Sequence, residues 1–337
     1  MTSKTYVVTG GTGFIGSALV QRLVRGGHRV RVLDDNSRGA ARRLGDAAAA
    51  VELVSGDIRD AGAVKQAIRG ADCVCHLAYV NGTEYFYTKP ELVLEVAVKG
   101  MVNVLDACVE HRVRELVLVS SSEVYQTPCV VPTPEDVPLS VPDVLNPRYS
   151  YGGGKIISEL MLINYGRKVF DRAMVLRPHN VYGPDMGWEH VIPQFVTRMQ
   201  ALASEPRREP DVIDFPIQGT GRETRAFVHV SDLVDGALRV LEQGEHLGIY
   251  NIGTDVETTI ADLAHAVARC FGREIRVVPG ELRLGGTPRR CPDITRIRRL
   301  GYQPRVSLGE GLTTTVDWYR RNVAPNRAGV PVNPPVP

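Results

Sequence analysis

A tyrosine and a lysine four residues apart, Tyr151 and Lys155, are the first candidates for chemistry in the sequence. They fall at the start of a predicted helix over Ser150–Phe170, where this spacing places both side chains on one face. An ammonium beside a phenol lowers the pKa of the phenol towards neutrality, so Tyr151 could take a proton from an alcohol. Ser121 follows a predicted strand, at the sheet edge where open α/β sheets bind ligands. The alternative is chance placement of the pair on a solvated helix.

Three glycines at three-residue spacing, Gly10, Gly13 and Gly16, lie where a predicted strand over Tyr6–Thr9 gives way to a helix. The first permits a tight turn, the second lets a pyrophosphate approach the backbone, and the third allows close packing of helix on strand. Free backbone N–H groups and the helix dipole then face the phosphates. The pattern predicts a dinucleotide cofactor, with a simple turn as the alternative.

A second predicted strand, Arg29–Leu33, leads into Asp34. A carboxylate there accepts hydrogen bonds from the adenosine ribose and repels a 2′-phosphate, which favours NAD over NADP. Asp35 competes for this role, and Arg38 lies close by. Asp57 is placed either to touch the adenine or to cap the next helix. The remaining predicted cofactor contacts are Phe14, Ile15, Asn36, Ile58, Leu77, Ala78, Tyr151, Lys155 and Pro178.

Short β-branched runs alternate with longer amphipathic stretches through the first half of the chain, which predicts an α/β fold with a Rossmann-type doubly wound parallel sheet. We expect an NAD-binding domain over residues 1–178, with segments near 225–252 as candidates to return to it. A smaller C-terminal α/β substrate domain over 179–323 and a disordered proline-rich tail over 324–337 would follow. The further predicted elements are strands Val51–Ser55, Cys73–Leu77, Leu116–Ser120 and Ala173–Arg177 and helices Phe14–Gly26, Asp60–Arg69, Pro90–Arg112 and Ile192–Leu202.

The charges of the 337-residue chain nearly cancel, with 40 Lys and Arg against 38 Asp and Glu, so no global field would attract nucleic acid or an anionic membrane. No apolar stretch approaches about 18 residues, and Met1 stands almost directly before the first strand. We therefore expect neither a membrane span nor a secretion signal. Six cysteines without paired spacing or a histidine set argue against a metal site or disulfides and favour the cytoplasm.

Several motifs together resemble the extended short-chain dehydrogenase/reductases, and among them the NAD-dependent sugar-nucleotide epimerases and dehydratases. The resemblance covers nearly the whole chain. The motifs are TGGTGFIG, HLA (His76–Ala78), SSSEVY (Ser120–Tyr125), YGGGK (Tyr151–Lys155), RPHNVYGP (Arg177–Pro184), TRAFVHVSDLVDG (Thr224–Gly236) and RRCPDITRIRRLGYQPRVSLGEGL (Arg289–Leu312).

The resemblance implies a nucleotide-diphosphate sugar as substrate. Tyr151 would remove the C4 hydroxyl proton while a hydride passes to NAD, and Ser121 would hydrogen-bond the reacting hydroxyl. Lys155 would hold the nicotinamide ribose and, together with the positive nicotinamide, lower the pKa of Tyr151. It also implies a homodimer through the helices Pro90–Arg112 and Ser150–Phe170. The alternative is that the outer faces of these helices are exposed to solvent and contact no partner. Asn180, Arg225 and Arg290 match residues on the diphosphate side. His190 and Val191 belong to a loop that either lines the sugar site or packs.

Glu123 bears on which reaction follows the 4-keto sugar. The 4,6-dehydratases and uronic-acid decarboxylases of the family also carry a glutamate there, although a solvated loop carboxylate is the plain alternative. Ser122 stands where the dehydratases have an aspartate, and the sequence YSYGGGK differs from the decarboxylases. We favour a 4-epimerase. The alternatives are a dehydratase or decarboxylase using Glu123, a net keto-sugar oxidoreductase and a non-catalytic NAD-binding protein. The sequence leaves open which nucleobase and which sugar the substrate carries.

Three residues depart from the family pattern. Tyr79 replaces a small residue after HLA, Ala97 replaces a frequent asparagine, and Gly154 replaces the common serine before the lysine. These departures leave the shape of the substrate pocket open.

Overall fold

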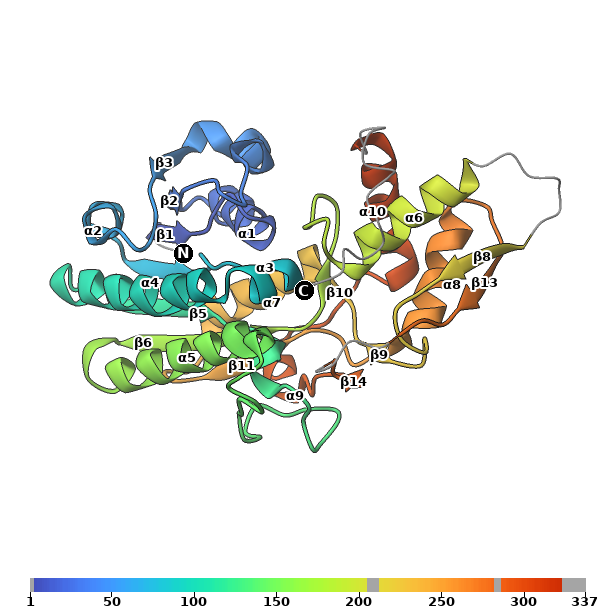
Figure 1. Cartoon of the computed structure of the whole chain (residues 1–337). Coiled ribbons are helices and arrows are strands. Elements are labelled where there is room, and N and C mark those ends of the chain that lie inside the picture. Colours follow the sequence, from blue (N-terminus) through green and yellow to red (C-terminus); the bar gives the residue numbers. More distant parts are fainter. Residues whose placement is uncertain (1–2, 205–211, 282–285, 323–337) are drawn as a thin grey trace.

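The computed structural model of the chain describes residues 3–204, 212–281 and 286–322. Figure 1 shows a large lobe built on one sheet and a smaller lobe beside its carboxyl edge. The tail predicted to be disordered, residues 324–337, lies outside the described residues.

The large lobe is built on a seven-stranded parallel sheet with the order β11-β6-β5-β4-β1-β2-β3. This confirms the Rossmann-type prediction. The strand order changes direction between β1 and β4, and a ligand crevice opens at such a point in doubly wound folds. The strands are β1 (Thr5–Thr9), β2 (Arg29–Asp34), β3 (Val51–Ser55), β4 (Cys73–His76), β5 (Glu115–Val119), β6 (Arg172–Pro178) and β11 (Ile249–Ile252).

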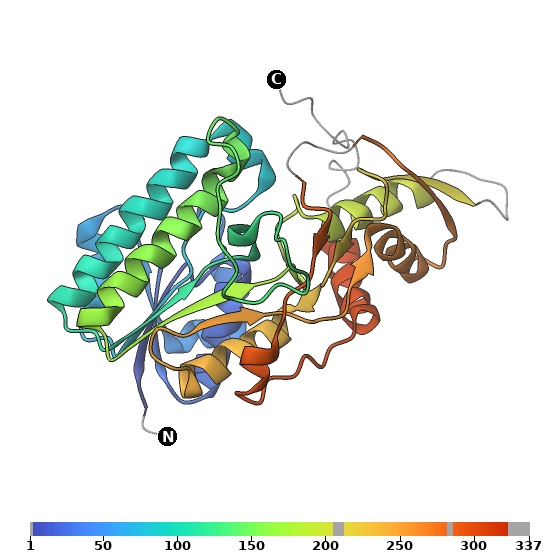
Figure 2. The same ribbon diagram turned by 90° about the horizontal axis from the view of Figure 1, so that it is seen from below.

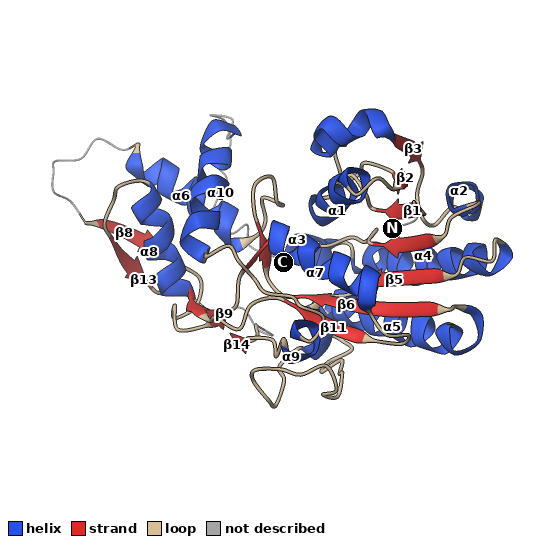
Figure 3. Ribbon diagram, turned by 180° about the vertical axis from the view of Figure 1, so that it is seen from behind, coloured by secondary structure: helices blue, strands red, loops and turns tan. Residues whose placement is uncertain are grey.

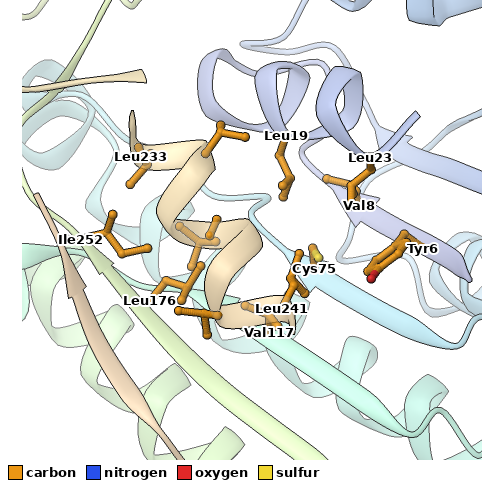
Figure 4. Close-up of a cluster of buried hydrophobic side chains, with 14 of the residues drawn as sticks. Tyr6, Val8, Leu19, Leu23, Cys75, Val117, Leu176, Leu233, Leu241 and Ile252 are labelled. Carbon is orange, nitrogen blue, oxygen red and sulfur yellow. The ribbon is translucent and has the colours of Figure 1, made fainter. Parts of the chain in front are cut away.

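Helices cover both faces of this sheet because its strands carry apolar side chains on both sides. On one face, Leu19, Leu23, Leu233 and Leu241 of the helices share one buried cluster with Val117 of the sheet (Figure 4). On the other face, two long helices run side by side (Figure 2). The first face carries α1 (Phe14–Arg25) and α7 (Val230–Gln243), and the second carries α2 (Ala61–Ile68), α4 (Pro90–Glu110) and α5 (Ser150–Val169).

The smaller lobe has a separate apolar core. Helices α6 (Val191–Ala203), α8 (Ile260–Cys270) and α10 (Leu308–Asn322) pack together, and a parallel pair of short strands, β8 (Ile213–Pro216) and β13 (Ile275–Val278), lies along their outer side, as Figure 3 shows.

Short strands join the two lobes near the carboxyl edge of the main sheet. Strand β7 (Val181–Tyr182) pairs with β10 (Val228–His229). Strand β9 (Thr224–Arg225) pairs with both β12 (Thr258–Thr259) and β14 (Arg289–Arg290), so segments far apart in the sequence meet beside the crevice.

Most predicted elements of the first half are present with ends shifted by one or two residues. Helix α2 begins at Ala61 because the Asp60 carboxylate accepts hydrogen bonds from the N–H groups of Gly62 and Ala63. The alternative in which Asp57 caps this helix is therefore wrong. The elements of the first half that were not predicted are α3 (Thr83–Thr88) and the 3₁₀ segments η1 (Ala41–Ala50), η2 (Ser122–Tyr125) and η3 (Pro147–Tyr149). In the second half only the helix α6 was predicted individually, so its other elements, among them α9 (Thr295–Arg298), were not.

Within the described ranges, no helix combines the length and apolar character that a bilayer crossing requires. The same residues contain no group of three or more His, Cys, Asp or Glu side chains that could hold a metal ion.

Candidate active site

A cavity of about 410 Å³ lies at the carboxyl ends of the sheet strands. Asn36, Val191 and Arg225 are not among the residues that line it. The predicted site residues that do line it are Gly10, Gly13, Phe14, Ile15, Gly16, Asp34, Asp57, Ile58, Leu77, Ala78, Ser121, Glu123, Tyr151, Lys155, Pro178, Asn180, His190 and Arg290.

The glycine-rich turn at one end of the cavity has no room for side chains. Gly10 has a φ of +70°, and a Cβ on it would lie 2.7 Å from the backbone nitrogen of Ala78. A Cβ on Gly16 would lie 2.1 Å from the Gly10 carbonyl oxygen. Gly13 precedes α1 without a side-chain cap, which leaves the first N–H groups of this helix for an anionic ligand. The turn therefore fits the pyrophosphate of a dinucleotide.

Asp34 is the buried carboxylate at the end of β2. It accepts hydrogen bonds from the backbone N–H groups of Thr12 and Asn36, both at 2.9 Å. Asn36 thus shapes this site through its backbone. The neighbouring Asp35 instead accepts hydrogen bonds from the backbone and the hydroxyl of exposed Ser37. Asp34 is consequently the better placed of the two carboxylates to meet a ribose.

Tyr151, Lys155 and Ser121 come together at the middle of the cavity. The Tyr151 and Ser121 side chains share a hydrogen bond. The Lys155 ammonium is buried and donates to the Val119 carbonyl oxygen at 2.7 Å. The spacing of four on α5 and the end of β5 therefore bring the three predicted groups to one place.

In the protein without NAD, burial dominates the pKa values of Tyr151 and Lys155. Burial raises the pKa of Tyr151 to about 12, opposed by its hydrogen bond with Ser121. Burial lowers the pKa of Lys155 to about 7. The expected lowering of the pKa of Tyr151 involves a positive nicotinamide as well as Lys155, and it stays a prediction for the NAD-bound protein. Without NAD, the ammonium lies 3.7 Å from the centre of the Tyr79 ring and 5.9 Å from that of Tyr151.

Glu123 stands in a cluster of arginines at the substrate end. Its carboxylate lies 2.7 Å from the Arg290 guanidinium and 3.9 Å from that of Arg148. Burial acts to raise the pKa of Glu123, but Arg290, Arg148 and Arg225 together bring it below its ordinary value. The reading of Glu123 as a solvated loop carboxylate is therefore wrong. Sequence reasoning did not single out Arg148, although its position three residues before Tyr151 was an available signal.

The loop before α6 is tied to the large lobe. Glu189 pairs with Arg38, and Asp185 pairs with both Arg42 and Arg43. Through these contacts the small lobe reaches the segment that follows Asp34.

Side chains of the same loop divide between packing and the cavity. Trp188 packs against Tyr319, with ring centres 4.6 Å apart, which agrees with the packing alternative. His190 lines the cavity directly before α6. Asn180, which follows β6, also lines the cavity; it has a φ of +40°, and its amide donates to the Ala226 carbonyl oxygen at 3.4 Å.

The family model for the NAD-dependent epimerase/dehydratase family matches residues 6–253. The chain belongs to this family. It is 35% identical over 320 residues to a UDP-glucose 4-epimerase of Mycolicibacterium smegmatis, covering 93% of this chain and 98% of the relative. It is 33% identical to a dTDP-glucose 4,6-dehydratase of Streptomyces antibioticus, covering 94% and 93%. It is 32% identical to UDP-glucuronic acid decarboxylase 2 of Arabidopsis thaliana, covering 94% and 68%.

Solved structures agree with this family and fold. A dTDP-glucose 4,6-dehydratase of Streptomyces venezuelae with NAD bound matches with a TM-score of 0.83 and 32% identity, covering 94% of this chain and 97% of that one. A UDP-glucose 4-epimerase of Thermus thermophilus in complex with NAD matches with a TM-score of 0.81 and 29% identity, covering 95% and 100%. This family member thus resembles enzymes with different outcomes, and the site itself must suggest which reaction it performs.

Proposed function

We propose that this family member is a nucleotide-sugar 4-epimerase that retains NAD. The observation that carries the proposal is the ion pair of Glu123 with Arg290, at 2.7 Å. The same cavity holds Tyr151 and Ser121 for oxidation of an alcohol. The carboxylate that would act on the neighbouring carbon in a dehydratase is engaged by a cation.

The oxidation depends on how the protein holds one proton. Tyr151 is the group that takes the C4 hydroxyl proton, and Ser121 orients that hydroxyl through the hydrogen bond it now shares with Tyr151. When bound, NAD supplies a nicotinamide ring that accepts a hydride and gives it back, and its positive charge stabilises a nearby phenolate. Lys155, buried next to Val119, is placed to bond the nicotinamide ribose. Asp34 and the glycine turn would hold the rest of the dinucleotide.

Epimerisation needs no further acid or base once the 4-keto sugar has formed. Reduction on the opposite face returns the proton from Tyr151 and leaves the mass of the sugar unchanged. Arg290 and Arg148 keep Glu123 ionised and lower its basicity, so removal of a C5 proton by this group is disfavoured. Once their ion pairs loosen, these arginines can also face a diphosphate, for which the guanidinium geometry is suited.

A second candidate is a dehydratase or uronic-acid decarboxylase. It is favoured by the position of Glu123 in the cavity wall, together with Ser121 and Tyr151. A substrate diphosphate that draws Arg290 away would free the glutamate as a base. The two candidates differ in their products.

The deciding experiment is product analysis. The purified protein is incubated with UDP-, GDP-, ADP-, CDP- and dTDP-linked sugars, and the products are examined by mass spectrometry and NMR, with Tyr151→Phe protein as the inactive control. We expect an unchanged mass with inverted configuration at C4. Loss of water or of carbon dioxide would establish the second candidate instead. Net change of the NADH absorbance during turnover would indicate an oxidoreductase, and bound NAD without any turnover a binding protein.

We further propose that two copies associate through α4 and α5. Leu160 is 59% exposed and Tyr165 is 37% exposed on α5, while Leu94 and Val109 are exposed on α4. Exposed apolar side chains on two adjacent helices suit a contact in which α4 and α5 of one copy pack against α4 and α5 of a second copy. Sedimentation equilibrium should show a dimer for the native chain and a monomer for Leu160→Glu, and a native monomer would contradict the proposal.

A further inference from the structure

The three departures from the family pattern meet at one point of the structure. Tyr79 follows β4, Ala97 lies on α4 and Gly154 lies on α5. A Cβ on Gly154 would lie 2.3 Å from the Tyr79 hydroxyl oxygen and 2.8 Å from the Ala97 Cβ. A side chain at position 154 would therefore collide with the Tyr79 phenol. The small residues at 97 and 154 leave the volume that this phenol fills.

The Tyr79 ring touches both members of the catalytic pair. The Lys155 ammonium lies 3.7 Å from the ring centre, which is within the range of a strong cation–π contact. Tyr79 also meets Tyr151 edge to face, with centres 5.2 Å apart and planes at 84°. Phe86 stacks on Tyr151 as well, at 5.1 Å and 26°. The Tyr151 phenol is thus packed between two aromatic rings.

The Tyr79 hydroxyl contributes no hydrogen bond to this arrangement. Its oxygen is buried and has no partner among the residues that the structure describes. The ring, rather than the hydroxyl, accounts for the contacts with Lys155 and Tyr151. A role in holding neighbours should therefore survive replacement by phenylalanine and fail on replacement by an aliphatic side chain.

We propose that Tyr79 is a positioning residue for the oxidation step, whose ring fixes the Lys155 ammonium and the Tyr151 phenol in the space that Ala97 and Gly154 leave open. The contribution to turnover rests on the proposed function. The packing of Lys155 under the ring does not, and it can be measured without a substrate.

The effect on turnover is tested with three single variants, one double variant and one control, and NAD content and thermal unfolding are checked for each. We expect Tyr79→Phe to keep kcat within about 3-fold and Tyr79→Leu to lose about 10- to 100-fold, because only the second removes the ring. Gly154→Ser should lose about 10-fold or more. Its matched control is Gly153→Ser on the same helix, where a Cβ would meet only Val141 at 3.4 Å.

The double variant Tyr79→Leu/Gly154→Ser tests whether the two positions act as one unit. If Gly154→Ser acts by displacing the Tyr79 ring, it should cost nothing more once the ring is gone. We therefore expect kcat of the double variant to lie within about 3-fold of Tyr79→Leu. Losses that multiply, or a Gly154→Ser protein that matches Gly153→Ser, would overturn the proposal.

A substrate-free readout separates this inference from the proposed function. NMR of ¹⁵N-labelled lysine side chains in the NAD-bound protein reports the surroundings of Lys155, assigned by the signal missing from Lys155→Met; the chain has only six lysines. The Lys155 ammonium lies over the face of the Tyr79 ring, so the ring current of Tyr79 displaces its chemical shift. We expect this displacement to be lost in Tyr79→Leu and kept in Tyr79→Phe. Such a result in a protein inactive on every sugar supports the packing role and refutes only the reaction. An unchanged Lys155 signal in Tyr79→Leu overturns the inference whatever the activity.

Discussion

The Arg177 guanidinium donates two hydrogen bonds to the Glu159 carboxylate, at 3.0 and 2.6 Å, and both side chains are buried. Glu159 lies on α5 and Arg177 on β6, so the pair fixes the catalytic helix to the sheet. Glu159 also accepts a hydrogen bond from the Ser120 hydroxyl, next to Ser121. The Glu159 carboxylate therefore helps to fix the position of Tyr151 relative to Ser121 in the candidate active site.

Replacing Glu159 by glutamine should destabilise the fold. The change leaves the Arg177 charge buried without its counter-charge, and breaking such pairs costs about 3–5 kcal/mol. We expect urea unfolding to show a loss of about 3 kcal/mol, and kcat to fall because α5 loosens. Asp171→Asn is the control, since the Asp171 pair with Arg114 is exposed and contributes little. Equal effects of the two substitutions would refute this assignment.

Tyr151→Phe should lower kcat by at least about 10²-fold, because the substitution removes the group that takes the alcohol proton and leaves the ring packing in place. Binding of NAD and of the nucleotide sugar should be largely kept, as measured by calorimetry. Tyr149→Phe, two residues away and outside the cavity wall, serves as the control. A fully active Tyr151→Phe protein would remove this residue from the mechanism.

Glu123→Gln separates the two candidate reactions by kinetics. An epimerase should keep kcat within about 5-fold, since the carboxylate is an ion-pair partner of Arg290 and not a proton acceptor. A dehydratase or decarboxylase should lose at least about 10²-fold, in keeping with loss of an acid–base group. The measurement is steady-state turnover of whichever sugar nucleotide proves to be the substrate. Ser121→Ala should lower the rate in either case.

Asp34→Asn should weaken NAD binding about 10-fold and narrow the preference for NAD over NADP. The substitution removes the negative charge that repels a 2′-phosphate and one of the best acceptors for ribose hydroxyls. Titration of cofactor-stripped protein with both dinucleotides measures the two affinities. Asp35→Asn is the matched control, and a larger change in this variant would assign the ribose contact to Asp35.

The fold should lose stability in mild acid because two histidines are buried uncharged. Burial lowers the pKa of His76 and of His179 to about 3 from 6.5. The unfolded chain thus binds more protons between these values, so stability is fully present above pH 6.5 and falls as the pH drops towards 3. Each histidine should lower the free energy of unfolding by about 2 kcal/mol between pH 7 and pH 5. Urea unfolding of His179→Gln should show a shallower dependence on pH than that of the native chain, and an unchanged dependence would contradict the prediction.

The sequence was sufficient for the parts of the fold that short-range patterns encode. Apolar runs such as Tyr6–Thr9 are buried strands, and Gly10 and Gly16 fill a turn that admits no Cβ. Helix α3 was missed because six residues are too short for a helical repeat to be visible. Ends moved where a cap residue such as Asp60 fixed them.

The details of the site depend on contacts between distant segments, which no local pattern reveals. Glu123 and Arg290 are 167 positions apart, and their ion pair follows only from how β14 is placed beside η2. The pKa of Tyr151 depends on more than the spacing, because four positions on a helix give the direction of Lys155 but not what its ammonium faces. Tyr79 departs from the family pattern, but its contact with Gly154 depends on how the segment after β4 packs against α5.

The return of β11 to the edge of the main sheet has a consequence for how the chain matures. Strand β6 pairs at its outer edge with β11, which is synthesised only when the chain has been made through Ile252, after α6 and β8 of the other lobe. Until then, a nascent chain on the ribosome carries an open β6 edge that can pair with other chains. The nucleotide lobe is therefore completed late, and fragments that end near residue 178 should depend on chaperones or aggregate.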